Sequence, residues 1–183
     1  MREPSIVRIA WLRRPSLRGL ALAGLLCAAS AVHANVIFVA ASAVSPGGNS
    51  CSLVDAIDAA NNNAASGACP AGDDQTNGGD VIVLAAGVYN IGSVDDDWYG
   101  PNGLPPIASK ITIVGDSGGT VIRRSPNQGV QAFRIFFVSG GQSLANYKPP
   151  TDFSTLPSRG SLTLVNLTLE NGLAQGGAGG ASA

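Results

Sequence analysis

Apolar residues beyond position 79 occur in short runs that are rich in β-branched and aromatic side chains. Glycine, asparagine, aspartate and serine residues close these runs, which occupy residues 80–84, 110–114, 120–122, 133–138 and 162–169. Such runs between turn residues are typical of strands. No helical pattern separates them, which argues against an alternating α/β fold. The pattern therefore predicts an all-β fold.

One earlier segment has the apolar spacing of a helix. Residues 52–62 place a single apolar stripe at positions i, i+3, i+4 and i+7, namely Leu53, Ala56, Ile57 and Ala60. Ser52 can accept a hydrogen bond from the backbone N–H of Asp55, and Asp55 can reach back, as in a capping box. Asparagines 61–63 can end the helix because asparagine tolerates the left-handed conformation. We predict a helix over residues 52–62.

The first 34 residues have the pattern of an export signal. Residues 1–18 contain five arginines and one glutamate, a formal charge of +4, and an apolar run follows at residues 19–32. That run is shorter than the ~20 residues needed to span a bilayer. We predict a signal peptide over residues 1–34, cleaved after Ala34, the alternative being an uncleaved membrane anchor. The expected location is the outer membrane, the extracellular space or the periplasm of a bacterium.

Removing this segment changes the charge and the chemistry. The 11 Lys+Arg and 12 Asp+Glu of the whole chain become 6 and 11, a formal charge of −5. An acidic chain with scattered cations is a poor ligand for phosphates, so we expect no nucleic-acid partner. The only histidine, His33, lies in the removed segment. The remainder therefore cannot form a Ser-His-Asp triad or a histidine-ligated zinc site.

Two cysteines remain after residue 34, Cys51 and Cys69. An even number of cysteines in an exported chain predicts a structural disulfide. The alternative, a catalytic thiol, would need a nearby base, and no histidine remains to supply it.

Two all-β architectures compete. A sandwich would show tight two-residue hairpin turns between strands, and these signals are mostly missing. A parallel β-helix would show short strands at a loose period; Ile82, Ile113 and Phe136 are separated by 31 and 23 residues, and such solenoids tolerate insertions at their bends. Two insertions are visible, at about 92–106 and 142–159. The pattern favours the parallel β-helix.

Several motifs carry a family resemblance. Residues 51–57 read Cys-Ser-Leu-Val-Asp-Ala-Ile, and Ala60-Asn61 follow. Matching segments then occur in order at residues 79–89, 111–122 and 162–180. Together these resemble the CSLREA-type N-terminal domain of bacterial surface and secreted proteins, which include polymorphic outer membrane and adhesin-like proteins. Val54 and Asp55 replace the arginine and glutamate of the family signature.

The resemblance implies a right-handed parallel β-helix, of which this chain holds the N-terminal coils, with a short amphipathic capping helix. With the predicted signal peptide at 1–34 and the predicted disulfide, the chain divides into three regions: the signal peptide, a cap with the helix and disulfide at 35–78, and the first coils, truncated by the end of the sequence, at 79–183. A cap of this kind hides the open end of a solenoid. The resemblance implies no single activity.

Acidic loops are candidates for Ca²⁺ binding. The candidate ligands are Asp73, Asp74, Asp80, Asp95, Asp96 and Asp97. Carboxylates among glycines and asparagines can bind Ca²⁺, but neither loop has the spacing of an EF-hand. Consecutive acids point in different directions, so solvated loop charge is the competing interpretation. No cofactor is therefore predicted, with Ca²⁺ as the alternative.

No catalytic residues are predicted. β-Helix enzymes that act on acidic polysaccharides use acids, Ca²⁺ and a Lys or Arg base, and the candidates here are Lys110, Asp116, Arg123, Arg124 and Arg134. Glu170 is the only glutamate after residue 34, so a paired-carboxylate hydrolase would have to use loop aspartates. Nothing in the sequence places two carboxylates together.

Three aromatic residues lie in polar inserts, Trp98, Tyr99 and Tyr147. Exposed aromatics on the loops of a rigid scaffold can stack on sugars or contact a protein. The competing interpretation is that they pack back on the strands. The expected partner is therefore a host or matrix protein or a carbohydrate, with membrane contact only through an anchor outside this chain.

Three functional hypotheses follow. The first is a non-enzymatic binding or adhesion scaffold at the cell surface or secreted from the cell. The second is the N-terminal part of a polysaccharide-degrading lyase or hydrolase whose catalytic coils lie outside this chain. The third is a gene fragment without independent function, because two or three uncapped coils would expose an apolar end.

Overall fold

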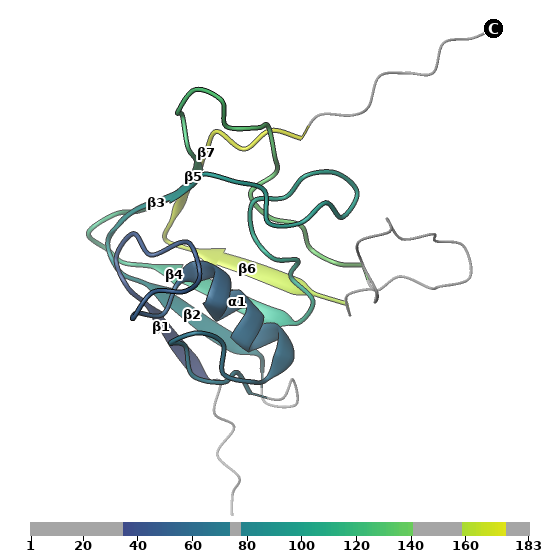
Figure 1. Ribbon diagram of the computed structural model, residues 1–183. Coiled ribbons are helices and arrows are strands. Elements are labelled where there is room, and N and C mark those ends of the chain that lie inside the picture. The colour runs from purple at the N-terminus through teal and green to yellow at the C-terminus, as the bar shows by residue number, and fades with distance from the viewer. Residues whose placement is uncertain (1–34, 74–77, 141–158, 175–183) are drawn as a thin grey trace, which may run out of the picture. The chain divides into compact units, whose positions relative to one another are not determined.

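Seven strands and one helix form the described part of a computed structural model, which covers residues 35–73, 78–140 and 159–174 (Figure 1). All of these residues belong to one unit, Val32–Ala183. The elements in chain order are β1 (Val36–Val39), α1 (Leu53–Asn62), β2 (Asp80–Leu84), β3 (Gly87–Ile91), β4 (Lys110–Gly115), β5 (Thr120–Arg124), β6 (Ser161–Val165) and β7 (Thr168–Glu170).

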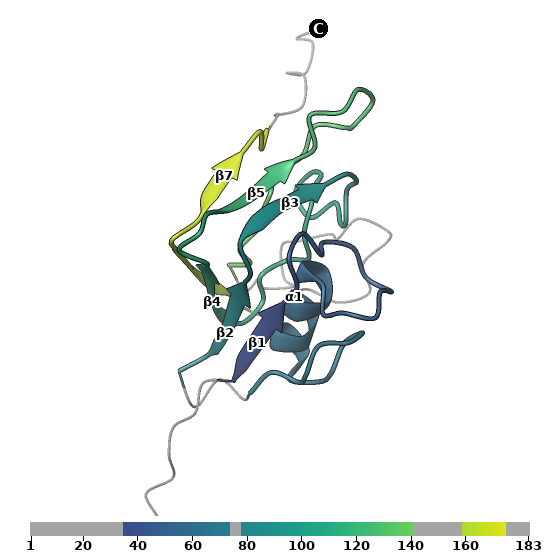
Figure 2. The same ribbon diagram turned by 90° about the vertical axis from the view of Figure 1, so that its left-hand side faces the viewer.

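The strands form two parallel sheets, with the orders β1-β2-β4-β6 and β3-β5-β7. Each consecutive strand pair after α1 contributes one strand to each sheet, so β2 is followed by β3, β4 by β5 and β6 by β7. Figure 2 shows the two sheets as separate layers of strands. The registers align Ile82 with Ile113 in one sheet and Tyr89 with Ile122 in the other.

The prediction of a right-handed parallel β-helix is wrong. The two sheets stay open, and the segments that return the chain between them, 92–109 and 125–140, hold no strand. The predicted strand 133–138 forms only isolated bridges to Asn102 and Ile107. The facing segment contains Pro101, Pro105 and Pro106, and proline has no N–H for a ladder. What stands is the coarser statement of a β-rich chain with one helix.

The predicted strand 162–169 is also corrected. It is two strands in different sheets, β6 and β7, because Asn166 has a φ of 53° and turns the chain between them. The Asn166 amide donates to the Gly115 carbonyl at 3.0 Å. This bond fixes the turn against the end of β4.

The helix begins and ends where its pattern predicts. Ser52 caps α1: its Oγ accepts from the Asp55 N–H at 3.1 Å, and its hydroxyl donates to Asp55 Oδ2 at 2.7 Å. The Asp55 carboxylate thus meets the Ser52 hydroxyl. Asn63 ends the helix with a φ of 51°. All four residues of the predicted stripe are fully buried.

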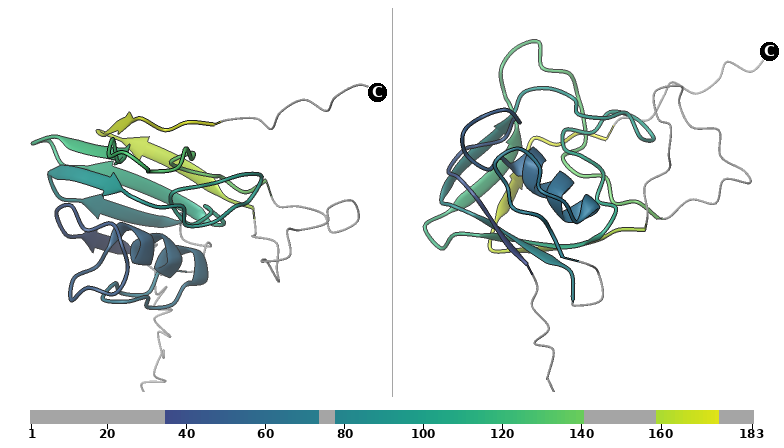
Figure 3. Two further views of the ribbon diagram at one scale, coloured as in Figure 1. Left: turned by 45° about the horizontal axis from the view of Figure 1, so that its top comes forward. Right: turned by 60° about the horizontal axis from the view of Figure 1, so that its bottom comes forward.

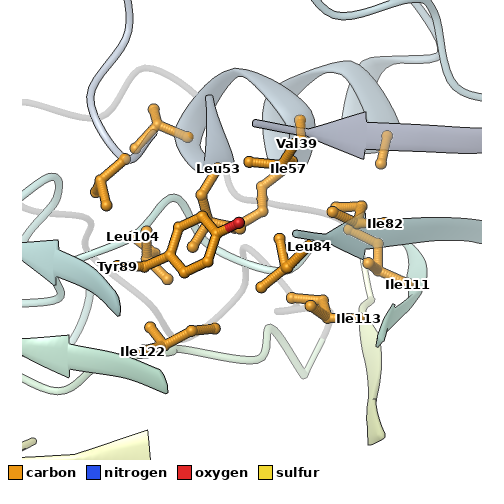
Figure 4. Close-up of a cluster of buried hydrophobic side chains, with 14 of the residues drawn as sticks. Val39, Leu53, Ile57, Ile82, Leu84, Tyr89, Leu104, Ile111, Ile113 and Ile122 are labelled. Carbon is orange, nitrogen blue, oxygen red and sulfur yellow. The ribbon is translucent and has the colours of Figure 1, made fainter. Parts of the chain in front are cut away.

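The core lies between the sheets and α1. Figure 4 shows Leu53 and Ile57 of the helix packed with Ile82, Leu84 and other strand residues. Leu104 and Phe133, from the two return segments, are also fully buried. Cys51 and Cys69 form the predicted disulfide with Cα atoms 4.5 Å apart, which ties the start of α1 to the loop after it.

Candidate functional site

The loop at residues 95–102 builds a cluster of polar contacts. Its two ends pair: the Asp95 N–H donates to the Asn102 carbonyl at 2.8 Å, and the Asn102 N–H donates to the Asp96 carbonyl at 2.8 Å. Tyr99 and Gly100 turn the chain, with φ values of 54° and 105°. The 95–102 loop is therefore a closed turn with a defined conformation.

Two buried side chains hold this loop from inside. Asp96 Oδ1 accepts from the Trp98 N–H at 2.9 Å and from the Asn102 amide at 2.7 Å. Asn102 also donates to the Trp98 carbonyl at 3.1 Å. The remaining oxygens, Asp96 Oδ2 and Asn102 Oδ1, are buried without a hydrogen-bond partner among the described residues. A buried polar atom without a hydrogen-bond partner lowers the stability of the fold. The pair therefore holds the loop at a cost in free energy.

Arg134 fastens the loop to the return segment 125–140. Its Nη2 donates to the carbonyls of Trp98 at 2.8 Å and Gly100 at 2.7 Å. The guanidinium carbon lies 5.9 Å from the ring centroid of Phe137, and the rings of Tyr99 and Phe137 lie 5.7 Å apart. We call the side chains of Tyr99, Phe137 and Arg134 the Tyr99 surface. Tyr99, the central residue of this surface, is 48% exposed.

The acids around this loop titrate abnormally. The pKa of Asp95 is raised to about 6, first because neighbouring protein atoms displace water from its carboxylate, and then because of the charges of Asp96 and Asp58. Asp95 is nevertheless exposed at its outer side. Burial raises the pKa of Asp96 despite bonds from Trp98 and Asn102 and the charge of Arg134. Burial, then the charge of Asp55, raises the pKa of Asp58. Asp95 can therefore change charge near neutral pH.

The candidate Ca²⁺ ligands do not gather. Asp80 is buried in β2, where Oδ1 accepts from the Asp73 N–H at 2.8 Å and Oδ2 has no partner in the described ranges. Burial raises the pKa of Asp80. Asp97 is exposed, and Asp74 lies outside the described residues. Within those residues, no three His, Cys, Asp or Glu side chains are arranged to hold a metal ion.

The three aromatic residues that the sequence offered as ligand contacts differ in exposure. Trp98 is 2% exposed, so its ring packs inside and is removed from the ligand-contact residues. Tyr99 keeps an exposed ring. Tyr147 lies outside the described residues. The backbone of Trp98 is held on both sides, by Asp96 at its N–H and by Arg134 at its carbonyl.

The charged residues considered as candidates for catalysis contact separate partners. Arg123 donates to Asn90 at 2.6 Å and lies 3.8 Å from Glu170, while Arg124 donates to the Asn171 carbonyl at 2.8 Å. Asp116 accepts from the Gly118 N–H at 2.7 Å within the turn before β5. Lys110 is exposed at the start of β4. These contacts stabilise neighbouring strands and turns.

Two of the cavities are lined by described residues alone. One, of about 430 Å³, is lined by residues that include Arg134, Ile135, Leu169 and Leu173. The other, of about 620 Å³, is lined by residues near the disulfide, among them Phe38, Ser50, Cys51 and Ala68. The first adjoins the Tyr99 surface through Arg134.

Sequence reasoning missed Asn102 and Phe137. Phe137 was counted as part of a strand, and its role depends on a contact with Tyr99 that lies 38 positions away. Asn102 had a local signal, because the turn residues Gly100-Pro101-Asn102-Gly103 follow the three aspartates closely. That spacing is compatible with a closed turn in which an aspartate meets the asparagine amide.

No helix in the described residues is long and apolar enough to cross a membrane. The chain matches no model of a known family, no curated protein and no solved structure.

Proposed function

We propose that the chain is an exported, non-enzymatic binding scaffold whose ligand contacts the Tyr99 surface. The observation that carries the proposal is the ring of Tyr99, which is half exposed and yet held against Phe137 beside the Arg134 guanidinium. An aromatic ring with an exposed face and a fixed position offers contact area at a low cost in conformational entropy.

Hydrogen bonds cross-link the loop that supports this surface. The Arg134 guanidinium binds two carbonyls of the 95–102 loop. The Asp96–Asn102 pair closes the loop from inside. Binding residues are often carried on loops that a rigid scaffold positions. A ligand would therefore meet an ordered surface and would not have to order the loop itself.

Carbohydrate is the ligand class that the surroundings favour. Asp95 and Asp97 are exposed on the same loop as Tyr99. Carboxylates accept hydrogen bonds from hydroxyl groups, and an aromatic face can pack on the apolar side of a sugar ring. We therefore expect a glycan that is neutral or basic, because the two carboxylates would repel an acidic one.

Export rests on the sequence and on the disulfide. The arginine-rich start and the apolar run of residues 19–32 have the order of a secretory signal. The Cys51–Cys69 disulfide is typical of an oxidising compartment. The resemblance to CSLREA-type domains agrees with a bacterial surface or secreted protein. We propose release outside the cell or display at its surface.

One observation favours a second candidate, polysaccharide cleavage. A carboxyl group with a pKa of about 6, as at Asp95, has the acid strength of a general acid near neutral pH. A hydrolase also needs a second carboxylate that reaches the substrate. The neighbouring Asp96 is buried and bonded to Trp98 and Asn102, so the second carboxylate would have to be the exposed Asp97, next but one in the same turn. We therefore rank binding above cleavage.

A glycan array tests the proposal, followed by calorimetry on the ligands found. We expect Tyr99→Ala to weaken binding about tenfold or more, which corresponds to about 1.4 kcal/mol. The matched control is Phe38→Ala, which removes an aromatic ring that is 68% exposed on β1. Equal effects of the two variants, or no glycan bound, would contradict the proposal. Release of new reducing ends that Asp95→Asn abolishes would favour the second candidate.

A further inference from the structure

The geometry points to a proton shared by Asp96 and Asn102, which closes the 95–102 loop and makes its closure sensitive to pH. The two side chains already form one hydrogen bond, from the Asn102 amide to Asp96 Oδ1 at 2.7 Å. One oxygen of each group is left over. These atoms, Asp96 Oδ2 and Asn102 Oδ1, are buried without a hydrogen-bond partner among the described residues. The two unpartnered atoms therefore belong to groups that are already in contact.

One proton on Asp96 Oδ2 would satisfy both atoms. An ionised carboxylate only accepts hydrogen bonds, whereas a protonated one also donates from its O–H, and an amide oxygen accepts. Asp96 Oδ2 can then donate to Asn102 Oδ1 while Asp96 Oδ1 accepts from the amide. The amide itself does not serve Oδ2, because its two hydrogens are engaged by Asp96 Oδ1 at 2.7 Å and by the Trp98 carbonyl at 3.1 Å.

The surroundings favour a proton over a metal ion. Ca²⁺ takes about 6–8 oxygen ligands, and the carbonyls of Trp98 and Gly100 already accept from the Arg134 guanidinium. The positive charge of Arg134 would also repel a metal ion. Within the described residues, no three His, Cys, Asp or Glu side chains are arranged to hold one. A proton needs only the two oxygens that the pair presents.

Neighbouring charges act on Asp96 in both directions, and burial decides the outcome. Burial is the largest effect and raises the pKa of Asp96. The two hydrogen bonds to Oδ1 and the positive charge of Arg134 lower this pKa, and the negative charge of Asp97 raises it. Asp95 is coupled to Asp96 and to Asp58 of α1. The net direction is upward, which favours the protonated form that the geometry requires.

Loss of the proton would loosen the loop. Asp96 Oδ2 would then carry negative charge, and both leftover oxygens would stay buried without a donor, which is costly. Closure should be strongest below the ordinary pKa of 3.8 and be lost as the pH rises through the raised pKa of Asp96.

The same change would reach the Tyr99 surface. The loop and Arg134 lie on the return segments 92–109 and 125–140, which run side by side at the bridge between Asn102 and Arg134 (Figure 3). Tyr99 comes from the first segment, and Arg134 and Phe137 come from the second. The order of this surface should therefore follow the pH, and any effect on a ligand rests on the proposed function.

Carbon-13 NMR of the Asp96 carboxyl in the unmutated chain measures the proton directly. We expect a midpoint above the ordinary value of 3.8, and a red shift of the Trp98 emission as the pH rises through that midpoint. Asp96→Asn assigns the signal and provides a neutral analogue, because its amide can donate in place of the acid O–H. Its Trp98 emission should stay unshifted at every pH.

Asp97→Asn is the matched control. It removes a negative charge from the neighbouring, exposed position and leaves the pair intact, so the emission shift should persist with its midpoint moved to lower pH. An Asp96 midpoint at or below 3.8 would overturn the inference, whatever donor then serves the two oxygens. An Asp96 signal that moves on addition of CaCl₂ would overturn it in favour of a bound cation.

Glycan binding separates this inference from the proposed function. With a glycan found on the array, the dissociation constant of the unmutated chain should rise about tenfold as the pH passes the Asp96 midpoint. Asp96→Asn should keep the tighter binding. Tight binding that does not change across the midpoint would overturn the inference and leave the proposed function standing. A loop that titrates as expected in a chain that binds no glycan would contradict the proposed function alone.

Discussion

Replacing Arg134 with methionine removes a side chain that ties the 95–102 loop to the segment behind it. Methionine keeps an unbranched apolar stem of similar length, so the change isolates the guanidinium. Two hydrogen bonds are lost, to the carbonyls of Trp98 and Gly100. The contact with the Phe137 ring is lost as well.

The size of the effect follows from these contacts. A hydrogen bond to a charged group contributes about 1.5–3 kcal/mol, and a partly exposed cation–π contact contributes about 0.5–1 kcal/mol. The Trp98 carbonyl keeps its bond from Asn102, whereas the bond from Arg134 to the Gly100 carbonyl is lost. Arg134 is half-buried, so we take the lower values. Arg134→Met should lower the free energy of unfolding by about 2–3.5 kcal/mol, where the lower figure counts only the Gly100 bond and the ring contact.

Tryptophan fluorescence reports this change locally. Trp11 precedes the predicted cleavage site, so Trp98 is the only tryptophan of the processed chain. We expect its emission to shift to the red in native buffer as the loop opens, and the urea midpoint to fall. Arg123→Met is the control, because its contacts with Asn90 and Glu170 are both exposed and should together contribute about 1 kcal/mol. An unshifted emission with equal losses in the two variants would refute the role given to Arg134.

Three further predictions concern the fold and its charge. Gly67→Ala should lower the free energy of unfolding in urea by about 2–3 kcal/mol, because φ is 53° and a Cβ would lie 2.6 Å from the Asp55 carboxyl. The control is Gly47→Ala, where no atom lies near the added Cβ. It should show only the backbone cost of about 1–2 kcal/mol. Replacing Cys51 and Cys69 with serine should cost about 3 kcal/mol, since the disulfide closes an 18-residue separation, and a loss below about 1 kcal/mol would contradict the chain-entropy estimate. Acid should stabilise the fold, because raised pKa values mean that the folded chain binds protons more tightly than the unfolded chain. The carboxyl groups concerned are those of Asp58, Asp80, Asp95 and Asp96. The melting temperature should therefore rise as pH falls from about 6, the pKa of Asp95, toward its ordinary value of 3.8. Asp95→Asn should flatten this rise, and a melting temperature that falls over the same range would contradict the assignment.

Local sequence patterns predicted the elements in which apolar residues recur at regular positions. The stripe of α1 was visible because one face is buried along its whole length. The strands β2 and β4 were visible because apolar residues dominate them. The segment 133–138 looked the same, but a strand needs a partner with free N–H groups. Its partner contains three prolines, and that information lies some 30 residues earlier in the chain.

The candidate site was less predictable than the fold. The aspartates at 95–97 appeared as solvated charge, whereas Asp96 is buried and binds the backbone and side chain of its own loop. For Trp98 the sequence left two interpretations open, a ligand contact or a ring packed back on the strands, and the structure shows that the residue is buried. A pattern of polar residues does not distinguish a loop that points to water from one that satisfies its own polar groups.

The information that divides the chain between two sheets lies in its turns. Gly87 at the start of β3 has a φ of 145°, Gly119 just before β5 has a φ of 103°, and Asn166 between β6 and β7 has a φ of 53°. Each change of sheet therefore includes a residue with positive φ, which glycine and asparagine adopt most readily. Within an apolar run, such a residue marks a change of sheet more reliably than the hydrophobic pattern marks its end. Asn166 is the instructive case, because the run on both sides of it would otherwise read as one strand.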